Sequence, residues 1–299
     1  MVRQIQFNAD KPKIIDIFMY NGEPLLELRL KLLYDVVDEF ICVEARDVHS
    51  GARDKQGLYV EQYAAMLEPY RDKLTILIIE DFPTPDAGTV EALQARWSHI
   101  LPESAQAWYR ENYHRNYAAD YVRSKYVQND VPFVPLVCDL DELPDPAIVG
   151  VFGDSFATYE KLSTAHHLIM EHFFYNFRWR YTQPFSNAYA VNEQGFQDMH
   201  GDLNRMRSIP DPGFRGGGWH GSYFLSVGGI IRKLQSNAHR EFSTEQFVDP
   251  LMIRRCLRSG CNILQQEPVW VLHEHNVSAL PLPLQEFHRN LVFLQEHCG

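Results

Sequence analysis

Three carboxylates stand within four residues of one another near the middle of the chain, in the stretch VPFVPLVCDLDELPDP (131–146). Alternation along a strand end would point Asp139 and Asp141 to one side and Leu140 to the other. Carboxylates this close, with Glu142 beside them, resist ionisation unless a positive charge lies between them. Their oxygens are the ligands that Mg²⁺ and Mn²⁺ prefer. The stretch therefore predicts a cation site; a solvated strand-to-turn junction is the alternative.

A second group of polar side chains lies in ENYHRNYAADYV (111–122), just before the acidic strand. Asn112 and Arg115 are three residues apart, so they share one face of an expected helix. Because this helix leads directly into the acidic strand, we expect both side chains to face the same nucleotide ligand. The alternative is that Arg115 pairs with an acid on the surface.

A third candidate is the glycine-rich stretch RGGGWHGSY (215–223), which predicts a loop whose backbone can approach a ligand closely. Trp219 can supply an apolar face for a sugar ring. His220 can act as a base, a metal ligand or a phosphate donor. The alternative is an ordinary flexible loop with a packed tryptophan.

A fourth candidate is SNAHREF (236–242), in which His239 and Glu241 are two residues apart. On an extended segment they would point to the same side, as a metal ligand and a general base. The alternative is a surface ion pair with Arg240 or Lys233.

The elements that would position these side chains alternate in the first half of the chain. Apolar strands are expected at 13–20, 39–45, 74–81 and 131–141, and helices at 23–37, 61–74 and 104–126. Such alternation predicts an α/β fold, a mostly parallel twisted sheet flanked by helices. Ligands bind outside the carboxyl ends of such strands, where the acidic stretch lies.

The second half of the chain reads differently. The aromatic-rich segment 164–181 favours a strand, 210–223 a glycine-rich loop, 224–236 a helix and 267–276 a last strand. Another helix is expected from Asp249, with Gly260 as its stop. Neither a repeat nor a linker divides the chain, so we expect one domain over 1–299. Its nucleotide half would span about 13–150 and its acceptor half about 151–299.

The composition argues against several classes of protein. The 299 residues are 45% hydrophobic and carry a net charge of −11, which argues against a nucleic-acid-binding protein. The five cysteines form no CxxC pair, so a disulfide framework or a structural zinc site is not expected. Without an apolar stretch of about 18 residues or a signal core, neither a membrane span nor secretion is expected. These features favour a soluble, cytoplasmic protein.

Five motifs in order resemble glycosyltransferase family 17, the family of the β-1,4-mannosyl-glycoprotein 4-β-N-acetylglucosaminyltransferase. They are the segment DIFMYNGEPLLELRLKLLYDVVDEFICVEARDVHSG, then ENYHRNYA, CDLDELPDP, GGWHGSY and SNAHREF. The resemblance implies a GT-A fold, a sugar-nucleotide donor, a divalent cation and inversion at the anomeric carbon. The best-known members are membrane-anchored Golgi enzymes, and this chain shows no anchor, which favours a microbial or viral enzyme.

The expected reaction moves a sugar, for example N-acetylglucosamine, from a UDP-sugar to a hydroxyl of a glycan or glycoconjugate. Mn²⁺ or Mg²⁺ on Asp139 and Asp141, with His239 as a further ligand, would stabilise the departing diphosphate. Glu142 would either orient a sugar hydroxyl or tune the metal through the residues that bind it. Glu241 would accept the acceptor's proton, with Asp249 as second choice.

The remaining nucleotide-binding candidates stand at the ends of the first two strands, namely Phe18, Tyr20 and Glu44. Two other enzyme classes use the same acidic site, a sugar-nucleotide hydrolase and a nucleotidyltransferase. A non-catalytic carbohydrate-binding module is a further alternative, which the acidic strand end and the His/Glu pair argue against.

Overall fold

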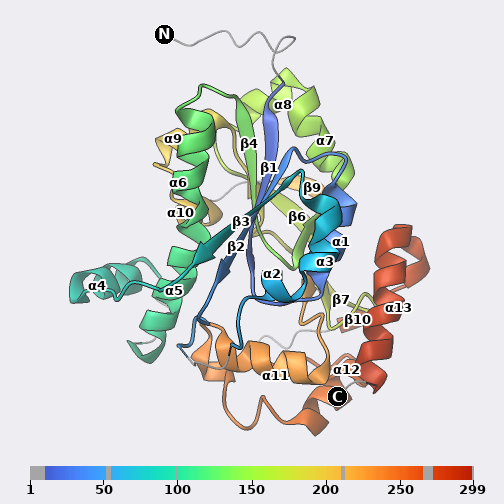
Figure 1. Cartoon of the computed structure of the whole chain (residues 1–299). Coiled ribbons are helices and arrows are strands. Elements are labelled where there is room, and N and C mark those ends of the chain that lie inside the picture. Colours follow the sequence, from blue (N-terminus) through green and yellow to red (C-terminus); the bar gives the residue numbers. More distant parts are fainter. Residues whose placement is uncertain are drawn as a thin grey trace.

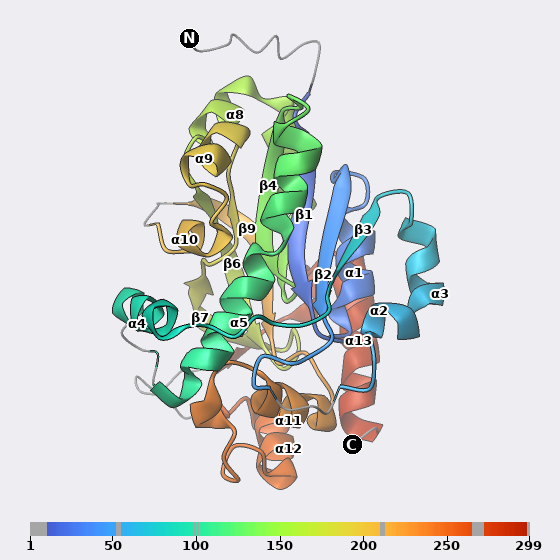
Figure 2. The same cartoon turned by 60° about the vertical axis from the view of Figure 1, so that its left-hand side comes forward.

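The computed structural model describes residues 11–51, 55–97, 100, 102–209, 213–264 and 272–297. Within these residues, one ten-stranded sheet runs through the molecule in the order β10-β7-β6-β8-β4-β1-β2-β3, with β9 beside β6 and β5 beside β9. Helices cover both of its faces (Figures 1 and 2). The expected α/β sheet flanked by helices is confirmed, but the sheet is mixed and not mostly parallel as expected, because the second half of the chain adds antiparallel pairs.

Four parallel strands come from the first half of the chain, as expected. Its strands are β1 (Lys13–Tyr20), β2 (Glu39–Ala45), β3 (Leu74–Ile79) and β4 (Phe133–Asp139). Central β1 pairs in parallel with β2 and with β4, and its register places Met19 opposite Asp139. Burial on both faces explains why β1, β2 and β4 are continuous apolar runs. The edge strand β3 is only partly buried.

The second half adds mainly antiparallel pairs, together with one parallel pair of strands, β6 with β9. The aromatic-rich segment forms a hairpin of two strands, β6 (His166–Phe174) and β7 (Trp179–Phe185). Short β8 (Tyr189–Ala190) joins this hairpin to β4. Strand β10 (Leu272–Glu274) pairs with β7, and the rest of the strand expected at 267–276 begins outside the described residues. These strands confirm the expectation of a strand at 164–181.

The glycine-rich segment is a strand, so the expectation of a loop at 210–223 was wrong. Strand β9 (Phe214–Ser222) lies between β6 and β5 (Glu142–Pro144). A Cβ atom on Gly217 would stand 2.8 Å from the Leu168 backbone, and one on Gly218 would stand 2.0 Å from the Leu143 carbonyl oxygen. The glycines therefore allow the backbones of the neighbouring strands to approach closely, which explains why they stand inside a strand.

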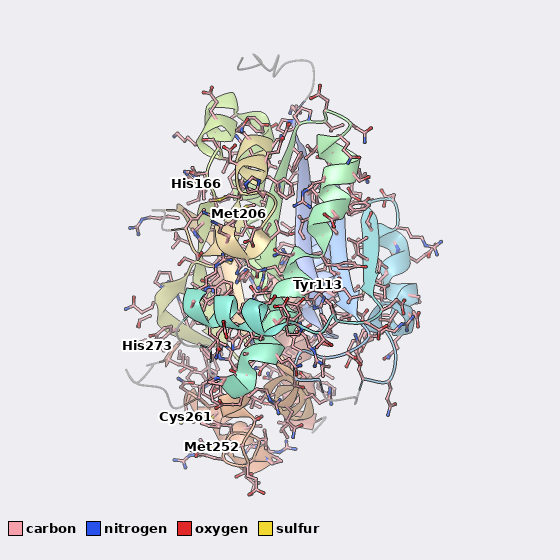
Figure 3. All side chains as sticks on the ribbon, turned by 90° about the vertical axis from the view of Figure 1, so that its left-hand side faces the viewer. Tyr113, His166, Met206, Met252, Cys261 and His273 are labelled. Atoms are coloured by element: carbon pink, nitrogen blue, oxygen red, sulfur yellow. The ribbon has the colours of Figure 1, made fainter. Side chains whose placement is uncertain are left out.

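Two apolar cores lie on opposite faces of the parallel strands. On one face pack α1 (Leu25–Leu33), α7 (Pro146–Asp154) and α13 (Leu282–His297). On the other face pack α6 (Ala118–Val122), α9 (Glu193–Asp198) and α10 (Leu203–Arg207), with the partly buried Tyr113 of α5 (Ala105–Asn116) beside them. Figure 3 shows this second face, with Tyr113 and Met206 labelled.

A third core holds α11 (Val227–Ser236) and α12 (Pro250–Ser259) against the β6–β7 hairpin. Figures 1 and 2 place these two helices below the carboxyl ends of the parallel strands. Asp249 caps α12 by accepting a hydrogen bond from Leu251 N, and Gly260 ends it in the left-handed region. Both boundaries confirm the prediction from sequence.

Two expected helices are broken into pieces. The segment 61–74 contains α2 (Tyr59–Gln62), α3 (Ala64–Leu67) and a 3-10 turn (Glu68–Tyr70), because Tyr63 leaves the helical conformation. The segment 104–126 divides into α5, α6 and a π-helical turn (Arg123–Val127). The remaining helices are α4 (Ala87–Arg96) and α8 (Phe156–Lys161).

No described helix combines the length and the apolar character needed to cross a bilayer.

Candidate active site

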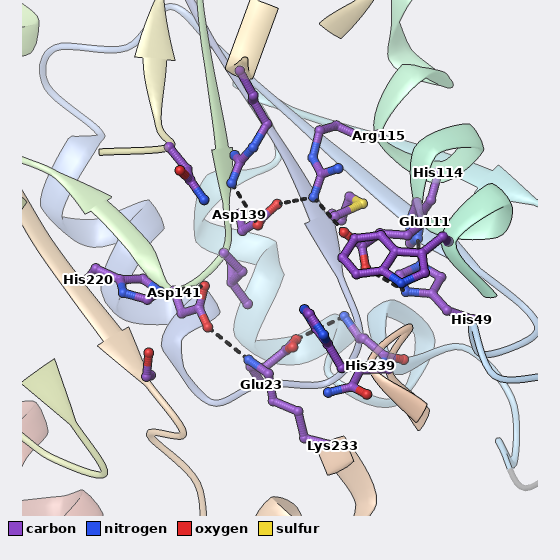
Figure 4. Close-up of a pocket in the computed structure, with 18 of the residues that line it drawn as sticks. Glu23, His49, Glu111, His114, Arg115, Asp139, Asp141, His220, Lys233 and His239 are labelled. Atoms are coloured by element: carbon purple, nitrogen blue, oxygen red, sulfur yellow. Dashed lines mark hydrogen bonds and ion pairs between the residues drawn. The ribbon is translucent and has the colours of Figure 1, made fainter. Parts of the chain in front are cut away.

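A cavity of about 720 Å³ opens at the carboxyl ends of β1 and β4, between α5 and α11. Figure 4 shows Asp139 and Asp141 inside it, with His220 on one side and the pair His49 and His114 on the other. Side chains from both halves of the chain line the cavity, among them His49, Glu111, Asn112, Arg115, Asp139, Asp141, Arg207, His220, Lys233 and His239.

Asp139 lies between two arginines. Arg115 of α5 donates to its Oδ1 at 2.9 Å, and Arg207 at the end of α10 donates to its Oδ2 at 3.1 Å. Burial alone would raise the pKa of Asp139, but the two guanidinium groups outweigh burial and lower it to about 2. This carboxylate is therefore ionised and has a cation on each oxygen.

Asp141 has a different set of partners. Lys233 of α11 donates to Oδ2 at 2.8 Å, and His220 Nε2 lies 3.7 Å from Oδ1. Burial alone would raise the pKa of Asp141, but Lys233 and then His220 hold it far below its usual range. Asp141 thus keeps a negative charge in the cavity, with one oxygen held by Lys233.

Glu142 is fully buried and does not line the cavity. Its carboxylate accepts the Asp139 backbone N–H at 2.6 Å and two hydrogen bonds from Arg207, at 2.8 and 3.1 Å. Burial raises the pKa of this carboxyl group. These contacts hold the strand end in place. The sequence predicted a positive charge between the carboxylates, and arginine and lysine side chains of this chain provide it.

The buried side chain of Arg29 holds the backbone of the acidic stretch. Arg29 of α1 and Asp16 of β1 form a fully buried, two-point ion pair, with distances of 2.7 and 2.6 Å. The same guanidinium donates to the carbonyl oxygens of Asp139, Leu140 and Glu142 at 3.2, 3.4 and 2.7 Å. The path of the backbone through the site therefore depends on a residue outside the cavity.

The helix pair predicted from sequence does face the cavity. Arg115 reaches Asp139 as described, and Asn112 lines the same wall while its side chain donates to the Trp108 carbonyl at 2.8 Å. Asn204 of α10 binds both, because it accepts from Arg115 and donates to the Asn112 carbonyl. The α5 wall is thus rigidly connected to α10.

The candidates at the first two strand ends lie outside the cavity. Phe18 and Tyr20 are buried in the first core. Glu44 is fully buried, accepts the backbone N–H groups of Tyr59 and Val60 at the start of α2, and pairs with Lys55. The structure therefore gives Glu44 a capping role and no direct path to a ligand.

Trp219 and His220 follow one another on β9 and point to opposite faces. Trp219 packs in the first core, whereas His220 lines the cavity. The His220 ring stacks on Phe185 with a centroid distance of 3.7 Å, and its buried Nδ1 has no hydrogen-bond partner among the described residues. Trp97 and Trp108 are the tryptophans that line the cavity.

His239 and Glu241 do form a pair. His239 lines the cavity, and its Nδ1 donates to Glu241 Oε1 at 2.7 Å, since a carboxylate can only accept. Glu241 itself is exposed and does not line the cavity. Asp249, the exposed cap of α12, does not line it either.

Several cavity residues were not named as site candidates from the sequence. Arg207 and Lys233 lie far along the chain from the carboxylates that they bind, and His49 and Glu111 belong to no spacing pattern. Only Lys233 could have been suspected, because α11 contains the basic residue nearest to the SNAHREF stretch.

A divalent cation fits part of this site. No group of three or more His, Cys, Asp or Glu in the described ranges is placed to hold a metal by itself. Mg²⁺ and Mn²⁺, however, usually take one or two protein ligands and complete their shell with phosphate and water. Asp141 Oδ1 is a donor of the right kind, and the nearest ring nitrogen of His220, Nε2, lies 3.7 Å from it. Asp139 has both oxygens on arginines.

Neutral buried histidines make stability depend on pH. Burial, and then His49, lowers the pKa of His114 to about 3; burial, and then His220, lowers that of His172 to about 2. In the unfolded chain histidine has a pKa near 6.5, so below this pH only the unfolded state takes up these protons. We expect the free energy of unfolding to fall by about 1.4 kcal/mol per pH unit for each histidine below pH 6.5.

Urea unfolding between pH 7.5 and 5.5 would measure this slope. His172 lies among the aromatic rings of Phe174, Tyr181 and Phe185, so phenylalanine should fit in its place. His172→Phe should reduce the slope of the unfolding free energy against pH by the contribution of one proton, about 1.4 kcal/mol per pH unit. An unchanged slope in this variant would contradict the assignment to His172.

Comparison with known protein families matches residues 4–274 of the 299 to glycosyltransferase family 17. None of the curated proteins matches the chain.

Proposed function

Because this chain belongs to glycosyltransferase family 17, we propose that its cavity binds a UDP-sugar beside Asp139 and Asp141 and transfers the sugar to an acceptor hydroxyl. The observation that carries the proposal is the meeting of two ionised carboxylates with Arg115, Arg207 and Lys233 at the carboxyl ends of β1 and β4. In a GT-A enzyme, the fold that we propose for this sheet, this edge holds the nucleotide.

The three cations would bind the donor's diphosphate. Arginine and lysine are the usual partners of phosphate oxygens, and here they come from three separate elements around one point. A diphosphate placed there is close to the carboxyl ends of the parallel strands, so the sugar would extend toward the second half of the chain. Asp139 would keep Arg115 and Arg207 oriented for this contact.

The metal, Mn²⁺ or Mg²⁺, would be held by Asp141 and His220. When bound, it would neutralise charge on the departing nucleoside diphosphate. Lys233 already offers part of this charge at Asp141 Oδ2. The chain's own residues thus prepare an electropositive position for the leaving group beside the metal.

The base would be His239, oriented by Glu241. With Nδ1–H donated to Glu241, a neutral His239 has its lone pair on Nε2, where it can accept a proton at neutral pH. The acceptor hydroxyl would give its proton to this nitrogen as its oxygen bonds to the anomeric carbon. The anomeric carbon–phosphate oxygen bond breaks and the nucleoside diphosphate leaves with the electron pair, with inversion at that carbon. Glu241, which we first expected to be the base, would position it.

Glu241→Gln should lower kcat by about 10–100-fold, which is the usual loss when a partner that orients a functional side chain is removed. The donor dissociation constant should stay unchanged, because Glu241 lies outside the cavity. His239→Ala should lose more, about 10²–10⁴-fold, as expected for a general base. Steady-state kinetics with saturating donor would measure both.

Asp249→Asn is the matched control. Asparagine caps a helix as well as aspartate does, and Asp249 does not line the cavity, so activity should be retained. If Asp249→Asn is inactive while Glu241→Gln turns over normally, the base lies on α12 and the His239 assignment is wrong.

The proposed reaction itself is tested by UDP release. UDP-sugars would be incubated with Mn²⁺ or Mg²⁺, with and without a panel of glycan acceptors. Release that requires an acceptor supports the transferase. Equal release without any acceptor would instead indicate hydrolysis of the donor.

A further inference from the structure

A chain of hydrogen bonds at the wall opposite His220 fixes the tautomers of two histidines. His114 Nε2 lies 2.9 Å from the Val43 carbonyl oxygen, which can only accept, so this nitrogen carries a hydrogen. His114 Nδ1 lies 3.0 Å from His49 Nε2. In a neutral His114 this Nδ1 has the lone pair, and therefore His49 Nε2 must donate.

The consequence is a defined acceptor in the cavity. His49, like His114, is neutral, because burial and then Arg115 lower its pKa to about 3. With its hydrogen on Nε2, His49 presents the Nδ1 lone pair. The nearby Glu111 Oε2 is 4.0 Å away from Nδ1, beyond hydrogen-bond distance, and it can only accept as well.

Two acceptors 4.0 Å apart can share one donor, provided that it approaches both from the side of the cavity and not along the line that joins them. Glu111 is held in place because its Oε1 accepts from Arg115 at 3.2 Å. His49 and Glu111 both line the cavity, and they come from the part of the chain before β4 (Figure 4). In α/β sheets of this kind that part of the cavity accommodates the nucleotide.

We propose that His49 Nδ1, with Glu111 Oε2 beside it, binds an N–H or O–H group of the donor's nucleoside, a role that rests on the proposed function. The nucleoside of UDP has three groups with this chemistry, the imide N–H of the base and the 2′ and 3′ hydroxyls of the ribose. His114 acts as a positioning residue, because it fixes which nitrogen of His49 accepts.

His49→Gln tests the contact with little change to the fold. The glutamine Nε2 can replace the imidazole Nε2 as donor to His114, whereas the acceptor at the Nδ1 position is lost. We expect the UDP dissociation constant to rise about 3–10-fold, the worth of one hydrogen bond. Titrations would compare UDP, N3-methyl-UDP and 2′,3′-dideoxy-UDP. The analogue that lacks the recognised donor should bind the unchanged protein more weakly and lose nothing further in His49→Gln.

His114→Gln tests the positioning role. Its Nε2 can still donate to the Val43 carbonyl, but the acceptor for His49 is gone, so His49 should populate both tautomers. The ¹⁵N chemical shifts of the His49 ring would report this change, which a purely structural role for His114 would not produce.

Unchanged UDP affinity in His49→Gln, or an equal loss for all three ligands, would overturn the inference. So would a loss confined to the KM of the acceptor. If the unchanged protein binds no uridine nucleotide at all, the proposed function fails as well, and the two failures are thereby distinguished.

Discussion

Asp141→Asn should lower kcat by about 10²–10³-fold while the fold survives. This is the usual loss when one group that stabilises charge in the transition state is removed. Asparagine keeps the size of the side chain but removes the charge that faces His220 and a bound cation, and it leaves Lys233 without its ion-pair partner. The measurement is kcat with a UDP-sugar and acceptor across a titration of Mn²⁺.

Asp145→Asn is the matched control for this variant. Asp145 lies four residues further on and caps α7 by accepting from Ala147 N, a role that asparagine fills equally well. Its activity should match that of the unchanged protein. Full activity of Asp141→Asn at every Mn²⁺ concentration would refute the assignment of Asp141.

Arg29→Met should reduce the free energy of unfolding by about 3–5 kcal/mol. The substitution leaves Asp16 as a buried carboxylate without its partner, which is far less favourable than a buried pair. Urea unfolding followed by circular dichroism would measure the loss, with the denaturant slope compared between variants.

The double variant Asp16→Leu and Arg29→Met separates two effects of the same arginine. Removing both charges should recover much of the stability. It should not recover activity, because the carbonyl groups of Asp139, Leu140 and Glu142 still lack their donor. A double variant with full activity would show that these three hydrogen bonds do not hold the site.

Much of the fold could be predicted from the sequence because its central parallel strands are buried on both faces. β1, β2, β3 and β4 were all expected near their observed positions, since continuous apolar runs are the signal of such strands. The caps of α12 were predicted because Asp and Gly have strong local preferences. β9 was missed, because three glycines indicate a loop unless the neighbouring backbone is known.

The candidate site was predictable only where its residues are close in sequence or share a helix face. Asp139, Asp141, Asn112 and Arg115 were expected at one ligand and do line one cavity. The contacts of Arg207 and Lys233 with the two aspartates could not be foreseen, because a contact across roughly 70–90 residues leaves no local pattern. The division into a nucleotide half and an acceptor half stays a prediction.

The side chains of β9 were the hardest to assign, because a strand's two faces depend on its register. Trp219 was expected at a sugar and lies in the core, while its neighbour His220 faces the cavity.

The pairing of β9 with β5 also determines how precisely the chain must fold. Leu143 lies opposite Trp219, and Glu142 lies opposite His220. Gly218, the residue before Trp219, lies so close to the Leu143 carbonyl that no other residue fits there. A slip by one residue would exchange the two faces and bring the indole into the cavity in place of the imidazole. Molecules misfolded in this way would keep their strand content and lose their chemistry. The quality of a refolded preparation would therefore show in its specific activity, and its far-ultraviolet spectrum would not reveal the error.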